Sequence, residues 1–409
     1  MNHVSTAQRS QARKRSPYLG VDVPLLLTMI TLLLFGLLMV YSASWDFSLA
    51  IYDSANYIFS RQVTWLGLGL AVVLFCAGLD YHYWRRLALP AMMVTLVGLI
   101  SVLIINEVRH NASRTLNAGS YMPSELAKLV TVIYLAVWLY SKRNQLGDIN
   151  FGLMPLAVII GLLSGLIMLQ PDLSAAATIV FLGGILFFLA GGDLKQIFIL
   201  LGVTMVVGWL VVEIHPTGSA RMASYLEGIK DPTQASYHVR RSLEAFIKGG
   251  FFGVGIGKAD TKFTGLPVPP TDSIFAVVGE ETGIFGAGIL VTLFGVFLWR
   301  GMVIARQAPD LLGSLLAAGM TFWIVLEAFV NMAVMVGLLP FAGNALPFIS
   351  AGGSNLVVSL AGVGILMNIS RISKMENLKK GRTQDAVNDL RRSQRRRRVS
   401  GAGRTAGSR

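Results

Sequence analysis

The sequence has little of what a disulfide-stabilised protein or a metalloprotein needs. Among its 409 residues there is one cysteine, Cys76, which can form no intrachain disulfide and is interpreted as a thiol packed inside an apolar run. The histidines show no metal-ligand spacing; they are His3, His82, His110, His215 and His238. Disulfide scaffolds and zinc sites are therefore excluded.

Motifs of several enzyme classes are also missing. The G-x-S-x-G nucleophile elbow of the α/β-hydrolases does not occur. The run FGVGIGKA (252–259) is no phosphate loop, because Phe252 stands where the pattern needs glycine and Ala259 where it needs Ser or Thr. Its glycines fit turns or close packing better. We expect no organic cofactor.

Charge is scarce as well. Hydrophobic residues make up 54% of the chain and charged residues 14%, whereas soluble domains are about 45–50% apolar and about 25% charged. Apolar runs such as 23–40 and 288–299, with their flanks, reach roughly the 18–20 residues that cross a bilayer. Such runs recur along most of the chain, which favours a membrane protein over a large soluble protein with buried helices.

The positive charge is concentrated at the two ends. The net charge is +13, of which residues 371–409 contribute +10 and residues 1–20 contribute +4. Beside a membrane span, a basic end indicates a cytoplasmic flank attracted to anionic lipid more often than nucleic-acid binding. We therefore expect a basic N-terminal segment (1–20), a polytopic membrane domain (21–371) and a basic, disordered tail (372–409). The first apolar run is too long for a signal peptide and no A-x-A-like site follows it, so we expect no cleavable signal at the N-terminus.

The predicted fold class is an all-α integral membrane protein with about ten transmembrane helices. The candidate spans lie at about 24–43, 62–79, 88–105, 122–140, 152–169, 174–190, 196–213, 284–303, 313–338 and 354–370.

An even number of spans puts both termini on one side of the membrane. The connections on that side carry Lys or Arg, which predicts that the side is cytoplasmic. The other side then receives one large loop, 214–282, between spans 7 and 8, and the irregular stretches 106–128 and 338–355. Because irregular backbone in a membrane protein is tolerated beside a cavity, one extracytoplasmic site can be built from these three segments.

Several polar positions are candidate site residues. Glu125 and Lys128 of PSELAK are three residues apart on a predicted helix, so they can pair; an ion pair that holds helices together and a contact to substrate are both open. Asp172 is expected to cap the helix that begins near residue 173. In ISAGG (349–353), Ser350 and the two glycines that follow, Gly352 and Gly353, suit either close packing or ligand binding.

The large loop is rich in cations. An anionic ligand such as pyrophosphate would account for them, and a solvated surface is the alternative; they are Arg221, Lys230, Arg240, Arg241, Lys248, Lys258 and Lys262.

Three acids stand near the start of the eighth span, in TDSIFAVVGEETG (271–283). Asp272 is expected at the outer membrane edge, either as a helix N-cap or as a general base or metal ligand. Glu280 lies about 80° and Glu281 about 180° around an ideal helix from it. The three acids cannot converge unless the helix breaks, and Gly279 or Gly283 could break it.

Five motifs in this order resemble the SEDS family of bacterial membrane proteins (FtsW, RodA and SpoVE). They are PSELAKL (123–129), QPDL (170–173), FIKGGFFGVGIG (246–257), TDSIFAVVGEETG (271–283) and NMAVMVGLLPFAGNALPFISAGGSN (331–355), and the resemblance covers about residues 20–371. The stretch from Lys248 to Glu281 looks closer to the FtsW branch than to RodA.

This resemblance implies a peptidoglycan glycosyltransferase that polymerises lipid II on the outer face of the cytoplasmic membrane. It implies a class B penicillin-binding protein as partner transpeptidase, among other division or elongation proteins. The essential aspartate of the family maps onto Asp272, and the Glu and Lys of its P-S-E-L-A-K motif map onto Glu125 and Lys128.

The sequence departs from the family pattern at several places. Ser273 replaces the usual Phe, PVPP (267–270) replaces Pro-Glu-Pro-His, and NASRTL (111–116) lacks the Trp that usually follows its Arg. Ala351 and Asn355 replace a Tyr and a Ser. These changes put substrate detail and partner surfaces in doubt and leave Asp272 in place.

The chemistry of glycosyl transfer then assigns expected roles. Asp272 would take the proton of the acceptor's 4-hydroxyl, with inversion at the anomeric carbon. Arg114, Arg221 and Lys262 would bind the leaving pyrophosphate, and a divalent cation, Mg²⁺ or Mn²⁺, could share that task. A lipid II flippase and a non-catalytic scaffold of the division machinery are the rival hypotheses.

Overall fold

The computed structural model describes residues 20–109, 122–170, 172–214 and 216–402. This part of the chain is helical and contains no β-strand. Its α-helices are α1 (Val23–Tyr52), α2 (Tyr57–Gly78), α3 (Trp84–Arg109), α4 (Pro123–Lys142), α5 (Met154–Met168), α6 (Leu173–Leu189), α7 (Leu194–Ile214), α8 (Pro216–Lys230), α9 (Tyr237–Gly249), α10 (Ile274–Gln307), α11 (Leu311–Met335) and α12 (Gly353–Ala402).

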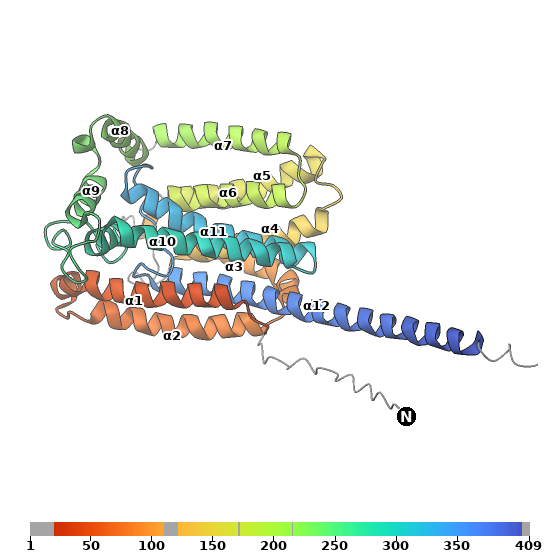
Figure 1. The fold of residues 1–409 in the computed structure, drawn as a ribbon. Coiled ribbons are helices and arrows are strands. Elements are labelled where there is room, and N and C mark those ends of the chain that lie inside the picture. Colours follow the sequence, from red (N-terminus) through yellow and green to blue (C-terminus); the bar gives the residue numbers. More distant parts are fainter. Residues whose placement is uncertain (1–19, 110–121, 171, 215, 403–409) are drawn as a thin grey trace, which may run out of the picture.

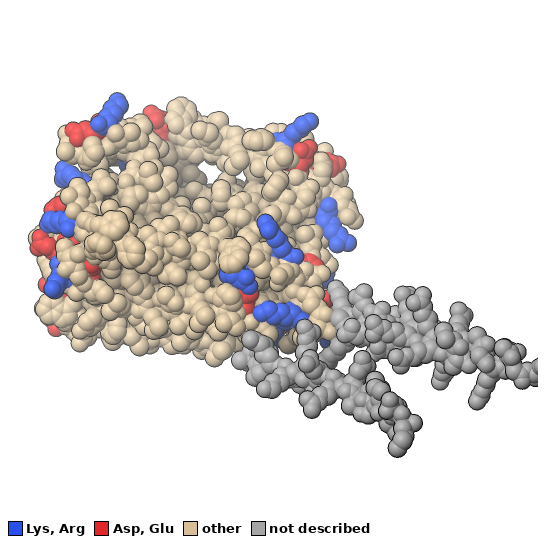
Figure 2. Space-filling view, viewed as in Figure 1, with Lys and Arg blue, Asp and Glu red and all other residues tan. Residues whose placement is uncertain are grey.

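The helices form a multi-pass membrane bundle. Among the described residues, nine helices are long and apolar enough to cross a bilayer, and α6 is an apolar helix of 17 residues that falls just short of that length. Together they account for the ten predicted spans. Figure 2 shows the Lys, Arg, Asp and Glu side chains gathered toward the two ends of the molecule, with an uncharged surface between them. This distribution is what a lipid-facing band requires.

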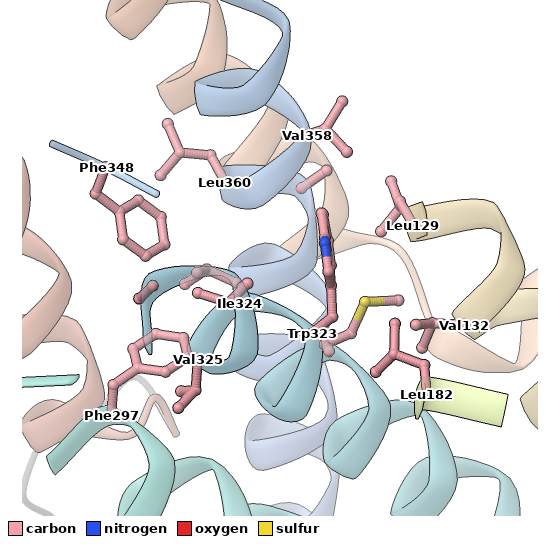
Figure 3. Close-up of a cluster of buried hydrophobic side chains, with 14 of the residues drawn as sticks. Leu129, Val132, Leu182, Phe297, Trp323, Ile324, Val325, Phe348, Val358 and Leu360 are labelled. Carbon is pink, nitrogen blue, oxygen red and sulfur yellow. The ribbon is translucent and has the colours of Figure 1, made fainter. Parts of the chain in front are cut away.

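Helix α11 lies at the centre of the bundle and packs against α4, α6, α10 and α12 (Figure 1). Its Trp323 is fully buried, on the side of the cluster that Leu129 and Val132 of α4 and Leu182 of α6 also form (Figure 3). Most of α11 is therefore shielded from lipid. A polar residue on α11 must accordingly find its partner inside the protein.

Helix α7 is the least packed of the spans. Only 11% of its most apolar window is buried, against 78% for α11, and its main neighbours are α6 and α8. Figure 1 shows α7 at the margin of the bundle, and Figure 2 shows the surface hollowed beneath it. Lipid chains can therefore approach the bundle along α7.

The segment 214–282 contains more helix than a single large loop would suggest. It includes α8, α9 and the first part of α10, which lie together at one end of the bundle (Figure 1). Helix α10 begins at Ile274, ten residues before the predicted span, and is kinked at Gly283 (φ 70°, ψ −175°). Of the two glycines that the sequence offered for a break, only Gly283 breaks the helix.

The opposite end of the bundle brings the two ends of the membrane domain together. Lys374 of α12 donates from Nζ to the carbonyl of Val21 (2.8 Å), and Arg300 of α10 pairs with Asp22, the N-cap of α1 (2.6 Å). Beyond this contact α12 continues to Ala402 as one helix, whereas the sequence predicted a disordered tail; residues 403–409 of that tail lie outside the described residues. The tail extends a stable span and contains no proline, so its helix needs no new nucleus.

Candidate active site

Helix α10 begins at the end of the bundle that carries α8 and α9 (Figure 1). Asp272 lies in the turn that leads into α10, and it is half-buried. The N-cap of α10 is Ser273, whose side chain makes no capping bond. The N-cap interpretation of Asp272 is therefore wrong, because the helix begins one residue too late for it. The prediction that Asp272 stands at the start of this helix is confirmed.

The stretch 341–351 packs directly against Asp272. If Gly343 carried a Cβ, that atom would lie 2.8 Å from Oδ2 of Asp272. Ser350 donates from Oγ to the carbonyl of Thr271 (2.7 Å), and the amide of Ala351 donates to the carbonyl of Pro270 (2.8 Å). Two of the three predicted outer segments, 214–282 and 338–355, thus meet at Asp272.

Glu280 and Glu281 do not join Asp272. Both are buried, and each fastens the segment 260–262 to α10. Glu280 accepts hydrogen bonds from the amides of Asp260 (2.9 Å) and Thr261 (3.2 Å), and Glu281 pairs with Lys262 (2.8 Å). Their role in the structure is to hold the chain that precedes Asp272. Helical geometry predicted their separation from Asp272.

The glycine-rich run FIKGGFFGVGIG fits against the kink of α10. The kink leaves helical backbone groups unpaired, and the run supplies their partners. The amides of Val254 and Gly255 donate to the carbonyls of Glu280 and Glu281, both at 3.0 Å. In return, the amides of residues 284 and 285 donate to the carbonyls of residues 250 and 251 at 3.0 and 3.1 Å. The glycines therefore serve close backbone pairing and turns and do not form a phosphate loop.

Glu125 and Lys128 form the predicted ion pair, with 2.9 Å between Oε2 and Nζ. Both are buried, and Lys128 also pairs with Glu327 of α11, while Nδ2 of the Asn355 side chain donates to Oε2 of Glu125 (2.9 Å). This network joins α4, α11 and α12. It supports the interpretation of the pair as an ion pair that holds helices together.

The cations of 214–282 are distributed over several contacts. The side chain of Lys262 is buried. Its ammonium group donates to Glu281, to the carbonyl (3.1 Å) and hydroxyl (3.0 Å) of Ser42, and to the carbonyl of Gly257 (3.1 Å), so it is occupied inside the protein. Arg241 and Lys248 pair with Glu244.

Arg221, a predicted pyrophosphate ligand, contacts the stretch that packs against Asp272. Its guanidinium lies 5.7 Å from the ring centroid of Phe341, two residues from Gly343. His238 of α9 stacks on the same ring, with 4.1 Å between centroids. Arg114 lies outside the described residues.

The remaining candidates serve the packing of 346–353. Ser350 accepts from the amide of Leu346 (2.8 Å) in addition to its bond to Thr271, so both functions of its hydroxyl are used. The amide of Gly352 donates to Gln62 of α2 (3.2 Å). A Cβ at Gly353 would lie 2.4 Å from the ring of Trp65, so the glycine permits α12 to begin against α2. Asp172 caps α6 as predicted, accepting from the amide of Ala175 (3.2 Å).

The sequence interpretation missed three residues of this region. Glu327 had a signal, because an acid within the apolar run TFWIVLEAFV requires a partner in a membrane. Asn331 follows it by one helical turn, and Gly343 had no distinguishing pattern. Among the described residues, no group of three or more His, Cys, Asp or Glu side chains could hold a metal ion.

The fold and the site define a polytopic helical membrane protein with an aspartate at one end of the bundle. A family model described as "Cell cycle protein", FTSW_RODA_SPOVE, matches residues 23–375. The chain belongs to this FtsW/RodA/SpoVE family, which confirms the resemblance to SEDS proteins.

Individual relatives agree with this assignment. Stage V sporulation protein E of Bacillus subtilis is 37% identical over 86% of this chain and 97% of its own length. The probable peptidoglycan glycosyltransferase FtsW of Trichlorobacter lovleyi is 36% identical over 87% of this chain and 95% of its own length.

Two solved structures share the fold. The structure described as "Structural coordination of polymerization and crosslinking by a peptidoglycan synthase complex" has a TM-score of 0.69 at 25% identity, covering 87% of this chain and 99% of that one. Rod shape determining protein RodA of Thermus thermophilus has a TM-score of 0.61 at 23% identity, covering 87% and 98%.

Proposed function

We propose that this protein is a peptidoglycan glycosyltransferase that polymerises lipid II into glycan strands on the outer face of the cytoplasmic membrane during cell division, with Asp272 as general base. Its relatives that are named probable peptidoglycan glycosyltransferase FtsW match over most of the chain. The role of Asp272 rests on its position. It is half-buried, in the turn before α10, which begins at the end of the bundle opposite the basic tail (Figure 1). It packs against the segment 341–343, which Arg221 also contacts.

The reaction follows from these groups. The Asp272 carboxylate takes the proton of the acceptor's 4-hydroxyl as that oxygen forms a bond to the anomeric carbon of the donor. The bond from the anomeric carbon to the pyrophosphate breaks at the same time, and the polyprenyl pyrophosphate leaves with the electron pair. Direct displacement inverts the anomeric carbon. Positive charge at Arg221, and at Arg114, stabilises the departing pyrophosphate.

Lys262 is a weaker candidate for this task than the sequence suggested, because its ammonium group is committed to Glu281 and Ser42. A divalent cation, Mg²⁺ or Mn²⁺, would depend mainly on the pyrophosphate oxygens, as Mg²⁺ commonly does with phosphate substrates. The described residues offer it no carboxylate cluster.

The lipid-linked substrate must arrive from the bilayer. The loosely packed margin along α7 offers space for a polyprenyl chain beside the bundle. We place both termini in the cytoplasm, in keeping with the basic ends of the chain. The fold shared with a peptidoglycan synthase complex supports a class B penicillin-binding protein as the partner transpeptidase.

The test uses the full-length protein in lipid nanodiscs, alone and with that partner, and labelled lipid II. Asp272→Ala and Asp272→Asn should lower kcat by about 10²- to 10⁴-fold, the usual contribution of a general base. Asp260→Asn is the matched control, an exposed carboxylate of the same end of the molecule, and should leave kcat unchanged. Full activity of Asp272→Asn would contradict the proposed base. Absence of glycan chains with every variant, wild type included, would favour a flippase or a scaffold.

A further inference from the structure

The backbone that carries Asp272 is held at three successive carbonyl groups. Those of Pro270 and Thr271 accept from Ala351 and Ser350, as described above, and that of Asp272 accepts from Nδ2 of Asn331 (2.9 Å). Hydrogen bonds to three consecutive carbonyl groups leave this turn little freedom to rotate. Of the three, Asn331 is the one on a transmembrane helix.

Asn331 also holds the stretch 341–344, which packs against Asp272. Its Nδ2 makes a second hydrogen bond, to the carbonyl of Asn344 (2.7 Å), and the Asn331 side chain is fully buried. Nδ2 of Asn344 in turn donates to the carbonyl of Glu327, one turn earlier on α11 (3.1 Å). One amide group therefore ties the Asp272 backbone and the 341–344 stretch to the same helix.

The 341–344 stretch lies directly against the carboxylate. A Cβ on Gly343 would come within 2.8 Å of Asp272 Oδ2 and has no other neighbour within 3.4 Å. Gly343 does not have a positive φ, so an alanine there would meet no backbone strain. The only group that such an alanine displaces is the Asp272 carboxylate.

Backbone strain marks both sides of this contact. Val268 (φ 45°) and Phe348 (φ 67°) are two of only three non-glycine residues with positive φ in the described part of the chain. A β-branched or bulky residue with a positive φ is strained, and such a conformation persists only where its surroundings impose it. Such outliers cluster at functional sites.

We propose that Asn331 is a positioning residue for Asp272, and that Gly343 reserves the space in which the carboxylate must lie to reach the acceptor hydroxyl. This inference rests on the proposed function. Asn331 acts through the backbone of Asp272 and Asn344, whereas Gly343 acts by the absence of a side chain. Loss of either should leave substrate binding intact and misplace the base.

The experiment measures kcat and KM for lipid II with the full-length protein in nanodiscs. Asn331→Ala and Gly343→Ala should each lower kcat by about 10- to 100-fold, the effect of misplacing a catalytic group by about 1 Å, with KM changed less than about threefold. The Gly343 variant should keep the thermal stability of the wild type. Asn368→Ala is the control for Asn331, because Asn368 is an equally buried amide at the other end of the bundle that accepts from the Tyr81 amide and donates to the Ala77 carbonyl. Gly184→Ala, at a buried glycine with open space, is the control for Gly343.

Three outcomes would overturn the inference. One is a wild-type kcat in Gly343→Ala, which also decides the matter if Asn331→Ala does not fold. Another is a loss of activity in Asn331→Ala that merely matches its loss of stability and equals that of Asn368→Ala. A third is a rise in KM without a fall in kcat. If Asp272→Asn is inactive while both positioning variants work normally, the inference alone fails; if Asp272→Asn is fully active, the proposed function fails first.

Discussion

Nζ of Lys262 lies 2.8 Å from Oε1 of Glu281, and both side chains are buried. Ser42 of α1 donates to the same carboxylate oxygen, so the contact joins α1, α10 and the segment before Asp272. Next to it, Glu280 holds the amides of Asp260 and Thr261. Two adjacent acids of α10 thus secure one short segment, one through a cation and the other through backbone amides.

Breaking this pair should be costly. Lys262→Met leaves a buried carboxylate without its cation, and we expect a loss of about 3–5 kcal/mol in the free energy of unfolding. Lys262→Met with Glu281→Met removes both charges and should recover much of that loss. Thermal unfolding in detergent micelles compares the stability of the wild type, the single variant and the double variant. A single variant with unchanged stability and a raised KM for lipid II would instead identify Lys262 as a pyrophosphate ligand.

The second buried ion cluster predicts a similar pattern at the centre of the bundle. Lys128→Met leaves Glu125 and Glu327 as two buried carboxylates that repel each other, so we expect a loss of about 3–5 kcal/mol or failure to fold. Lys142→Met, on the exposed last turn of the same helix, is the control and should be within about 0.5 kcal/mol of wild type. Membrane yield and thermal unfolding report the difference. Equal stability of the two variants would contradict a structural role for Lys128.

The kink in α10 makes a prediction about glycine. At Gly283 an alanine would adopt a backbone conformation reserved for glycine, and its Cβ would lie 2.4 Å from the carbonyl oxygen of Phe251. The backbone alone should cost about 1–3 kcal/mol, and the clash should detach the glycine-rich run from the kink. Gly288→Ala, five residues along the same helix with open space around it, should be neutral. Limited proteolysis within 250–257 should increase only in the Gly283 variant.

The sequence predicts the spans and the polar contacts that are local along the chain. Hydrophobic runs locate the helices, and short spacings give the pairing of Glu125 with Lys128 and the cap at Asp172, because these depend on neighbours within one helical turn. The separation of Asp272 from Glu280 and Glu281 also follows from helical periodicity.

The contacts that build the site are long-range and are invisible to such patterns. Asn331 meets Asp272 across 59 positions, and Lys262 meets Ser42 across 220. The sequence suggested Lys262 as a ligand for an anion, because no pattern in it predicts the ion pair between Lys262 and Glu281. Which of two adjacent acids binds backbone and which binds a cation is decided by the fold of the glycine-rich run.

His238 should make the end of the bundle near Asp272 sensitive to acid. Burial, and the nearby positive charge of Arg221, hold the pKa of His238 below its ordinary value near 6.5. The folded protein therefore disfavours the protonated imidazole, whereas the unfolded chain binds the proton readily. Stability from this residue is fully present above about pH 6.5 and is lost as the pH falls from there toward the lower pKa of the folded state.

His238→Phe isolates that contribution, because it keeps an aromatic ring stacked on Phe341 and removes the titrating group. Between about pH 7.5 and pH 5.5, the unfolding temperature of the wild type should fall more than that of His238→Phe, while the two should differ by a constant amount at higher pH. Other ionisable groups are present in both proteins and cancel in the comparison. Parallel pH profiles for the two proteins would show that the imidazole of His238 is not held neutral by this environment, and a steeper fall in the variant would reverse the sign of the argument.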